Sequence, residues 1–270
     1  MILRWILPLW LCCLTIPAFA QGDPAVADLY VDPVGKPYFL LEDDRLVTGN
    51  PLGVNTYSFY DSSLGSPDYV DVTNPFQILV YYREYGTAVV LDRTLSELDR
   101  IDLFANPNIQ QPGAIARSYD NGIWVFDNWD YRLLRLDDSG RIDQQTNNLR
   151  LQLGIAAPPS AIFVDRNAVI LHFPDKNRLA VFTNYGQFQY WVDTPPAEQL
   201  SWYAPRLLGT STSHGEGWLW SPPARKVRTL SRLPTAARTA TRILAGPGGE
   251  YLAVQPGVPG LSSGMLEEKN

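Results

Sequence analysis

Short apolar runs separated by turn-forming residues dominate the pattern of hydrophobic and polar positions along the chain. Runs such as "ILVYY", "IWVF" and "WLW" are rich in β-branched and aromatic residues, and clusters of Gly, Pro, Asn and Asp bound them. This is the pattern of β-strands and turns, whereas few segments have the apolar spacing of an amphipathic helix. The sequence therefore predicts an all-β protein.

The same arrangement of runs recurs along the chain at a nearly constant interval. Each unit has an apolar run, a short polar link, a second apolar run and then a turn. The four clearest units begin at Ile78, Ile123, Val169 and Gly217, and weaker copies begin at Pro37 and Arg242. The second run opens at Thr87, Arg132, Arg178 and Lys226, and it closes at Asp92, Asp137, Thr183 and Ser231.

A repeat of this length, with several strands in each unit, predicts a β-propeller of four-stranded blades. The inner strands of a blade are covered on both faces by neighbouring blades, so they should be apolar throughout, as "IWVF" and "ILVYY" are. A polar stretch such as "RIDQQTNN" suits an outermost strand that faces solvent. A two-sheet sandwich is the alternative, but it does not explain the regular spacing.

Units that start near residues 34, 74, 114, 160, 205 and 242 predict six blades, with the last one incomplete. Five blades is the alternative, if the N-terminal and C-terminal pieces share one blade. The run Ala27–Val31 could pair with the C-terminal unit and close the ring, which would remove exposed sheet edges. We expect one propeller domain over residues 21–256, followed by a disordered tail over residues 257–270 that is polar and rich in Gly and Pro.

The first twenty residues have the composition of a secretory signal peptide. Arg4 precedes an apolar run that ends at Ile16, and Ala18-Phe19-Ala20 places small residues at the cleavage positions. We expect cleavage before Gln21 and an exported protein of the periplasm or the extracellular space. A membrane anchor is disfavoured because the run is short and interrupted by proline, and no later stretch is long and apolar enough to span a bilayer.

Cysteine content and net charge narrow the possible partners. Cys12 and Cys13 both lie in the predicted signal peptide, so the mature chain would have neither a disulfide nor thiolate chemistry. The net charge is −6, and removal of Arg4 makes the chain more acidic. We predict that the protein binds neither nucleic acid nor anionic membranes, because phosphate groups are bound mainly by Lys and Arg.

Two stretches, Asp71–Leu95 and Asp120–Gly140, resemble a group of uncharacterised exported β-propeller proteins of Bacteroidota. The likeness extends over Tyr38–Thr194 and is most specific at "DVTNPF" and "LDRTL". It implies the propeller fold and an exported location, and it carries no catalytic residues because the group has no assigned activity. The chain lacks the repeated motifs of WD40 and kelch blades, so its blades resemble the less regular YncE- or NHL-like propellers by analogy.

The two histidines of the mature chain do not predict a catalytic or metal site. His172 lies in the inner-strand run "VILHF" and is interpreted as a core or channel histidine with a satisfied partner. His214 is close to Ser213 and Glu216, but no Gly-x-Ser-x-Gly elbow accompanies them, so a Ser–His–acid triad is disfavoured.

Two loops that might bind ions are better interpreted as turns. Asp137–Gly140 begins like a calcium loop, but the spaced acids that complete such a loop are missing. Gly246–Gly249 might suggest a phosphate loop, but no Lys-Ser or Lys-Thr pair follows it. We therefore predict no metal site and no cofactor.

Loops on one side of the propeller are the expected binding face. Four antiparallel strands per blade place the link between the second and third strands on the same side as the crossover to the next blade. Exposed aromatic rings beside Arg and Asp suit a protein or glycan partner, whereas the alternative for each ring is packing against the next blade. The residues predicted to line this rim are Tyr82, Arg83, Tyr85, Trp129, Asp130, Asp175, Trp202 and Tyr203.

The favoured function is that of an exported, non-enzymatic propeller that binds a macromolecular partner, protein or glycan, in the cell envelope. The alternative is a propeller hydrolase or lyase that acts on a glycan or a small metabolite at the central channel. Such an enzyme needs two or more Asp, Glu, His or Arg side chains that converge at the channel mouth. A structural or assembly role without a small ligand is a third hypothesis.

Overall fold

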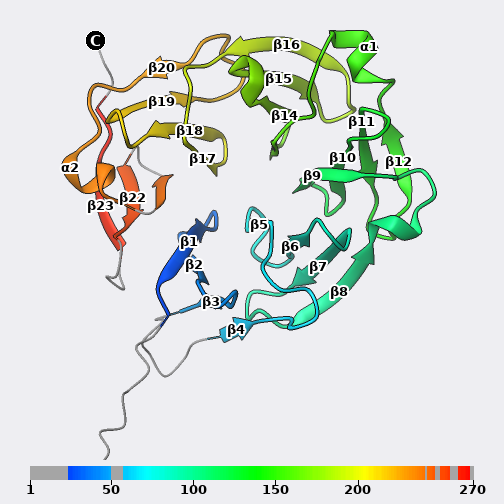
Figure 1. The fold of residues 1–270 in the computed structure, drawn as a ribbon, viewed down its shortest axis with the longest axis horizontal. Coiled ribbons are helices and arrows are strands. Elements are labelled where there is room, and N and C mark those ends of the chain that lie inside the picture. The colour runs from blue at the N-terminus through cyan, green and yellow to red at the C-terminus, as the bar shows by residue number, and fades with distance from the viewer. Residues whose placement is uncertain (1–23, 50–56, 241, 247–249, 256–260, 268–270) are drawn as a thin grey trace, which may run out of the picture.

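The computed structural model describes residues 24–49, 57–240, 242–246, 250–255 and 261–267. Its strands form six antiparallel sheets arranged in a ring, so the chain is a six-bladed β-propeller (Figure 1). The prediction of an all-β propeller with six blades is confirmed, and the alternatives of five blades and of a sandwich are wrong. The predicted signal peptide, residues 1–20, lies outside the described residues.

Each blade is a sheet in which consecutive strands pair from the inside of the ring outward. Blade 1 comprises β1 (Val26–Val31), β2 (Pro37–Leu41), β3 (Leu46–Thr48) and β4 (Tyr57–Phe59). Blade 2 comprises β5 (Tyr69–Asp71), β6 (Ile78–Tyr82), β7 (Thr87–Leu91) and β8 (Glu97–Asp102). Blade 3 comprises β9 (Pro112–Arg117), β10 (Ile123–Asp127), β11 (Arg132–Leu136) and β12 (Ile142–Gln145).

The second half of the ring continues the same order. Blade 4 comprises β13 (Ala161–Asp165), β14 (Ala168–Phe173), β15 (Arg178–Thr183) and β16 (Phe188–Asp193). Blade 5 comprises β17 (Gln199–Tyr203), β18 (Arg206–Ser211), β19 (Glu216–Trp220) and β20 (Arg228–Thr229). Blade 6 comprises β21 (Arg242–Ala245), β22 (Glu250–Val254) and β23 (Leu261–Met265). The helices are η1 (Leu103–Ala105), α1 (Leu149–Leu153), η2 (Pro174–Lys176) and α2 (Thr235–Arg238).

Burial follows the position of a strand within its blade. Every residue of β6, β10 and β14, the second strands of three consecutive blades, is buried. Residues of the outermost strand β12 alternate between partly buried and exposed. The apolar side chains of neighbouring blades pack together, as Leu79 and Val90 of blade 2 do with Ile115 and Val125 of blade 3. The core is therefore a ring of layers between blades, which explains the continuous apolar runs.

A shared turn closes the third strand of blades 2, 3 and 4. Asp92, Asp137 and Thr183 each accept hydrogen bonds from the backbone N–H groups two and four residues later, at 2.7–3.2 Å. The third strands begin at Thr87, Arg132 and Arg178, as the repeat predicts. Asp137–Gly140 is thus a turn, and the N–H of Gly246 donates to the carbonyl of Glu250 in the last predicted hairpin. Residues 247–249 lie outside the described residues.

In blade 5 the predicted register is wrong by one strand. The run after Gly217 belongs to the third strand, β19, and Lys226 precedes the fourth strand, β20. The weaker copy at Arg242 likewise aligns with a first strand, β21, and this agrees with the predicted start of a blade near residue 242. Inner strands of a propeller are buried on both faces whatever their order in the blade, so their apolar runs do not show which strand they form.

The two ends of the chain differ from the prediction. β1 pairs with β2 as the innermost strand of blade 1, so it does not pair with the C-terminal blade. Side chains close the ring instead, with Leu29 and Val31 packed against Leu244 and Val254. The tail was expected to be disordered, but β23 pairs with β22 over five residues. A solvent-facing outer strand needs few apolar residues, so the polar composition of the tail was a poor guide.

Candidate functional site

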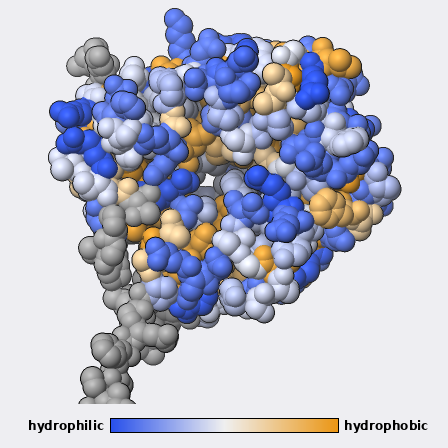
Figure 2. Space-filling view, in the orientation of Figure 1, coloured by the Kyte–Doolittle hydropathy of each residue, from blue (hydrophilic) through white to orange (hydrophobic). Residues whose placement is uncertain are grey.

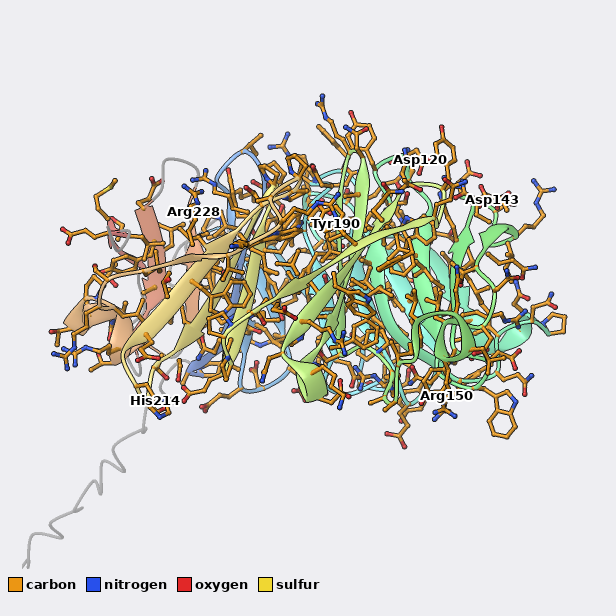
Figure 3. The ribbon with its side chains drawn as sticks, turned by 90° about the horizontal axis from the view of Figure 1, so that it is seen from above. Asp120, Asp143, Arg150, Tyr190, His214 and Arg228 are labelled. Atoms are coloured by element: carbon orange, nitrogen blue, oxygen red, sulfur yellow. The ribbon has the colours of Figure 1, made fainter. Side chains whose placement is uncertain are left out.

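The propeller has two faces that differ in the loops they carry. The crossover face has the links between second and third strands and the crossovers between blades, and the hairpin face has the remaining links. Figure 3 shows Arg150, of α1, and His214, of the β18–β19 link, on one side of the disc, and Asp120 and Asp143 on the other. Figure 2 shows a mostly hydrophilic surface with scattered hydrophobic residues and an opening at the centre of the ring.

Most of the predicted rim residues lie on the crossover face. Arg83 and Tyr85 are in the β6–β7 link, Trp129 and Asp130 are in the β10–β11 link, and Asp175 is in η2. Tyr82 ends β6 and is only 2% exposed, so it packs inside the blade and does not present its ring to a partner.

Three exposed aromatic rings lie in adjacent loops of this face, and we call them the aromatic patch. Tyr85, Phe104 and Trp129 are 46%, 48% and 66% exposed. The Phe104 ring covers Gly86, where an added Cβ would lie 2.6 Å from it. Gly86 has a φ of 57°, so glycine suits both this close approach and the backbone conformation. Phe104 was not predicted, because nothing in the crossover sequence distinguishes it from its neighbours.

Hydrogen bonds fix the loops that carry the aromatic patch. The Asp102 carboxylate accepts from the N–H groups of Phe104 and Ala105 at 2.9 and 3.3 Å, which caps η1. The N–H of Asn128 donates to the carbonyl of Gln111 at 2.8 Å, and Arg132 pairs with Asp130 at 2.6 Å. The aromatic patch therefore lies on a preorganised support.

Trp202 and Tyr203 were predicted to lie in a crossover, and this prediction is wrong. They end β17, the innermost strand of blade 5, and lie next to its hairpin link. Both line a cavity in the central channel of about 700 Å³, counted with its opening, together with Tyr30, Tyr69 and Phe163. Aromatic residues of four innermost strands thus line this one cavity, and the Phe163 and Trp202 rings of neighbouring blades lie 5.7 Å apart.

An ion pair and a tyrosine lie beside this central cavity. The Arg242 Nε lies 2.9 Å from Asp28 Oδ1, and the Tyr30 hydroxyl donates to Asp28 Oδ2 at 3.0 Å. Arg242 also donates to the carbonyl of Leu200 at 3.0 Å. Burial raises the pKa of Tyr30 well above its usual value, and the Asp28 charge adds to the effect. Tyr30 is therefore a neutral phenol near neutral pH and not a ready base.

The histidines do not form a catalytic site. His172 is 8% exposed and its Nδ1 lies 2.8 Å from the Ser160 hydroxyl, which confirms a core histidine with a satisfied partner. His214 Nδ1 lies 2.9 Å from the Ser213 hydroxyl, but the acid that contacts Ser213 is Glu198 rather than Glu216. The acid therefore contacts the serine, whereas in a triad the acid contacts the histidine and orients it toward the serine.

The hydrogen bonds of this cluster are those of a loop clasp. Glu198 accepts from the side chains of Ser213 and Thr212, and these bonds lower the pKa of its carboxyl to about 2. The clasp ties the β18–β19 link to the crossover that precedes β17. Its role is structural, because every contact is local to these two loops.

Metal-binding clusters and membrane-spanning helices are both absent from the described part of the chain. No group of three or more His, Cys, Asp or Glu side chains there is arranged to hold a metal ion. None of its helices has the length and apolar character needed to cross a membrane.

Comparison with known proteins gives structural neighbours only. No family model and no curated protein sequence matches the chain. A streptogramin B lyase structure is similar at 14% identity and a TM-score of 0.60, over 92% of this chain and 84% of the lyase. A catalytically inactive virginiamycin B lyase from Staphylococcus aureus with quinupristin is similar at 16% identity and a TM-score of 0.61, over 92% of this chain and 85% of the lyase. A chain of the nidogen/laminin complex is similar at 14% identity and a TM-score of 0.54, over 78% of this chain and 81% of that chain.

These neighbours support the propeller fold. Their low identities mean that the likeness is one of architecture, and propellers of this kind carry out unrelated functions. They include enzymes and subunits of protein complexes, so both kinds of function are compatible with the fold. The features of this chain itself must decide between them.

Proposed function

We propose that the protein is an exported, non-catalytic propeller that binds a macromolecular partner of the cell envelope through its crossover face. The observation that carries this proposal is the aromatic patch of Tyr85, Phe104 and Trp129, three large rings that stay exposed on fixed loops. Rings of this kind provide contact area at low conformational cost, and they are enriched among residues that dominate binding energy. We favour a protein partner over a glycan, which is the other class that such rings suit.

Site-specific photo-crosslinking tests this proposal. A photoreactive residue placed at Trp129 should capture a specific partner in envelope extract, whereas the same residue at Tyr185 should not. Tyr185 is 70% exposed and lies in the β15–β16 link on the hairpin face, so it controls for ring exposure alone. Equal capture at both positions, or capture at Tyr185 only, would reject the crossover face as the binding surface. A glycan array with the same protein tests the other partner class.

Export is a separate part of the proposal with its own test. The support is the N-terminal sequence, with Arg4, the apolar run and the Ala18-Phe19-Ala20 motif. When the full chain is expressed in a Gram-negative host, mass spectrometry of the periplasmic fraction should find a protein that begins at Gln21. An uncleaved chain in the cytoplasm or the membrane would contradict export.

An enzyme is the second candidate function, and one observation favours it. Asp28, Arg242 and Tyr30 converge beside the aromatic cavity of the central channel. A hydrolase or lyase would place a glycan or small metabolite there. Turnover in a substrate screen that Asp28→Asn and Arg242→Met both abolish, while Trp129→Ser does not, would support the enzyme and contradict the non-catalytic proposal.

A further inference from the structure

The outer strand of blade 4 forms an open edge of its sheet. Figure 1 shows β16 at the outer rim of the ring, and among the described strands it pairs with β15 only. The N–H of Thr194 donates to the carbonyl of Asn177 at 2.8 Å, so these two residues form a hydrogen-bonded pair. Hydrogen-bonded and non-hydrogen-bonded pairs alternate along an antiparallel ladder, which places Trp191 and Asp193 in non-hydrogen-bonded pairs. The backbone N–H and C=O groups of Trp191 and Asp193 therefore point away from β15, toward the open edge.

The other outer strands have features that discourage pairing with another chain, and β16 lacks them. Proteins block open sheet edges with short strands and with charged residues. β4 has three residues, β12 has four and β20 has two, whereas four of the six residues of β8 are charged. β23 contains two serines and a glycine, and glycine is depleted in strands. β16 has six residues, of which three are aromatic and one, Asp193, is charged.

Packing on both faces holds β16 in place. Phe188 and Trp191 pack against the cluster between blades 3 and 4, and Tyr190 packs against the cluster between blades 4 and 5. The Arg178 guanidinium stacks on Trp191, 4.4 Å from the ring centroid. The Arg225 guanidinium stacks on Tyr190, 3.5 Å from the ring centroid. A strand that is already ordered loses little conformational freedom when another strand pairs with it.

The sequence of β16 is compatible with antiparallel pairing to a second copy of itself. A bulge before Tyr190 limits the regular ladder to the residues that follow, so a twofold pairing would be centred on Trp191 or on Val192. In the first register Asp193 lies opposite Gln189 of the second copy, and in the second it lies opposite Trp191. Like charges directly opposite each other destabilise a pair of strands, and none meet in either register.

The other outer strand of six residues, β8, is not self-complementary. The residue at the centre of a twofold pairing lies opposite its own copy. In β16 this residue is Trp191 or Val192, and both suit a cross-strand pair. In the middle of β8 it would be Asp99 or Arg100, so like charges would meet. A second copy is therefore the occupant whose sequence complements the open edge of β16.

We propose that two copies of the protein associate through their β16 strands, which pair antiparallel and join two blades into one eight-stranded sheet. β16 runs from the hairpin face to the crossover face, so antiparallel pairing turns the second propeller over. The crossover faces of the two copies then point in opposite directions. The aromatic patch belongs to blades 2 and 3, so this association goes beyond the proposed function and does not depend on it.

Sedimentation equilibrium of the whole protein tests the proposal. Between about 1 µM and about 1 mM protein, the average mass should rise from that of one chain toward that of two. The mass of a single chain over the whole range would overturn the proposal. The open edge would then be available to an extended strand of another protein.

Proline variants locate the interface. Asp193→Pro removes an N–H group from the open edge and leaves the ladder with β15 intact, because Asp193 is not hydrogen-bonded there. It should weaken dimerisation at least about tenfold, since each dimer loses two hydrogen bonds between chains.

Gln145→Pro is the matched control for this variant. Gln145 is exposed and ends β12, as Asp193 is exposed and ends β16. The N–H of Thr146 donates to the carbonyl of Leu133 at 2.9 Å, so the N–H of Gln145 also points to an open edge. Gln145→Pro should leave dimerisation unchanged. Equal weakening by the two prolines, or no weakening by Asp193→Pro, would overturn the proposal.

Hydrogen exchange of the wild type is a second test, and it decides if Asp193→Pro fails to fold. The amides of Trp191 and Asp193 should exchange at least about tenfold more slowly at high protein concentration than at low concentration, because pairing protects them. The outward amide of Gln145 should exchange at the same rate at both concentrations. A dimer in which the Trp191 and Asp193 amides show no such dependence would form through another surface and reject the proposal.

Discussion

At the scale of single residues, His172 in the core of blade 4 makes the stability of the protein depend on pH. Its imidazole contacts the Ser160 hydroxyl at 2.8 Å, and burial lowers its pKa from 6.5 to about 4. The unfolded chain therefore binds a proton near pH 6.5, whereas the folded protein resists protonation until about pH 4. Acid favours unfolding across this window, since protonation of the folded state would charge a buried ring.

We predict that the free energy of unfolding falls as the pH is lowered from 6.5 to 4, by about 3 kcal/mol in total from this residue. Urea unfolding at a series of pH values measures the effect. His172→Gln should flatten the dependence of the unfolding free energy on pH in this window. His214→Gln, a substitution in an exposed loop, is the control and should leave this dependence unchanged. Identical profiles for the wild type and His172→Gln would show that another group is responsible.

At the scale of elements, close packing between neighbouring strands constrains blade 5. Gly209 of β18 pairs directly with Trp218 of β19, and a Cβ at Gly209 would overlap the Trp218 ring. The indole Nε1 donates to the carbonyl of Pro195 at 3.1 Å, which holds the ring in place over the glycine. The glycine is thus required by the partner strand and not by a turn.

Gly209→Ala should destabilise the protein by about 1–3 kcal/mol, because the added methyl group displaces the fixed indole. Trp218→Leu removes the ring and is costly by itself, but it should relieve part of the alanine penalty. The double variant should therefore be more stable than the sum of the two single effects predicts. Chemical denaturation of the four proteins measures this, and strict additivity would contradict the packing argument.

Elements whose structure depends on the local sequence could be predicted. Elements whose place depends on packing against other segments could not. The turns at Asp92 and Asp137 follow from side chains that bond their own backbone, so the sequence identifies them. The order of strands in blade 5 was wrong because inner strands share one pattern. Trp202 looked like a loop residue because prolines flank its short strand.

The candidate sites were predicted less well than the fold. Tyr85 and Trp129 could be placed on the crossover face by counting strands, because a link between known strands must lie at a known end. The third member of the aromatic patch, Phe104, has no signal of its own. Its position depends on the contact of its ring with Gly86, which belongs to another segment.

At the scale of the whole molecule, the ring is closed without strand exchange. Leu29 of blade 1 is fully buried and packs in one cluster with Leu244 and Val254 of blade 6, and Arg242 pairs with Asp28 across the same junction. Consecutive blades are connected by a crossover of the chain, whereas blades 1 and 6 are held together by side-chain contacts, so this junction should be the first to open.

Leu29→Ala should lower the free energy of unfolding by about 2–5 kcal/mol, because it leaves a cavity at this junction. Hydrogen exchange should then speed up in β1–β3 and β21–β22 before it does in β9–β11. Leu134→Ala, at the equally buried contact between blades 2 and 3, is the matched control. It should not speed up hydrogen exchange preferentially in blades 1 and 6. Uniform exchange in the Leu29 variant would show that the junction is no weaker than the others.

The central claim is that the aromatic patch on the crossover face binds a macromolecular partner. Its most direct test is the affinity of the partner captured at Trp129 for purified wild-type protein and variants. Tyr85→Ser with Trp129→Ser should weaken binding at least about a hundredfold, since buried anchor rings contribute about 2 kcal/mol or more each. Tyr185→Ser, on the hairpin face, should leave affinity unchanged. Equal affinities for the wild type and the double variant would contradict the claim.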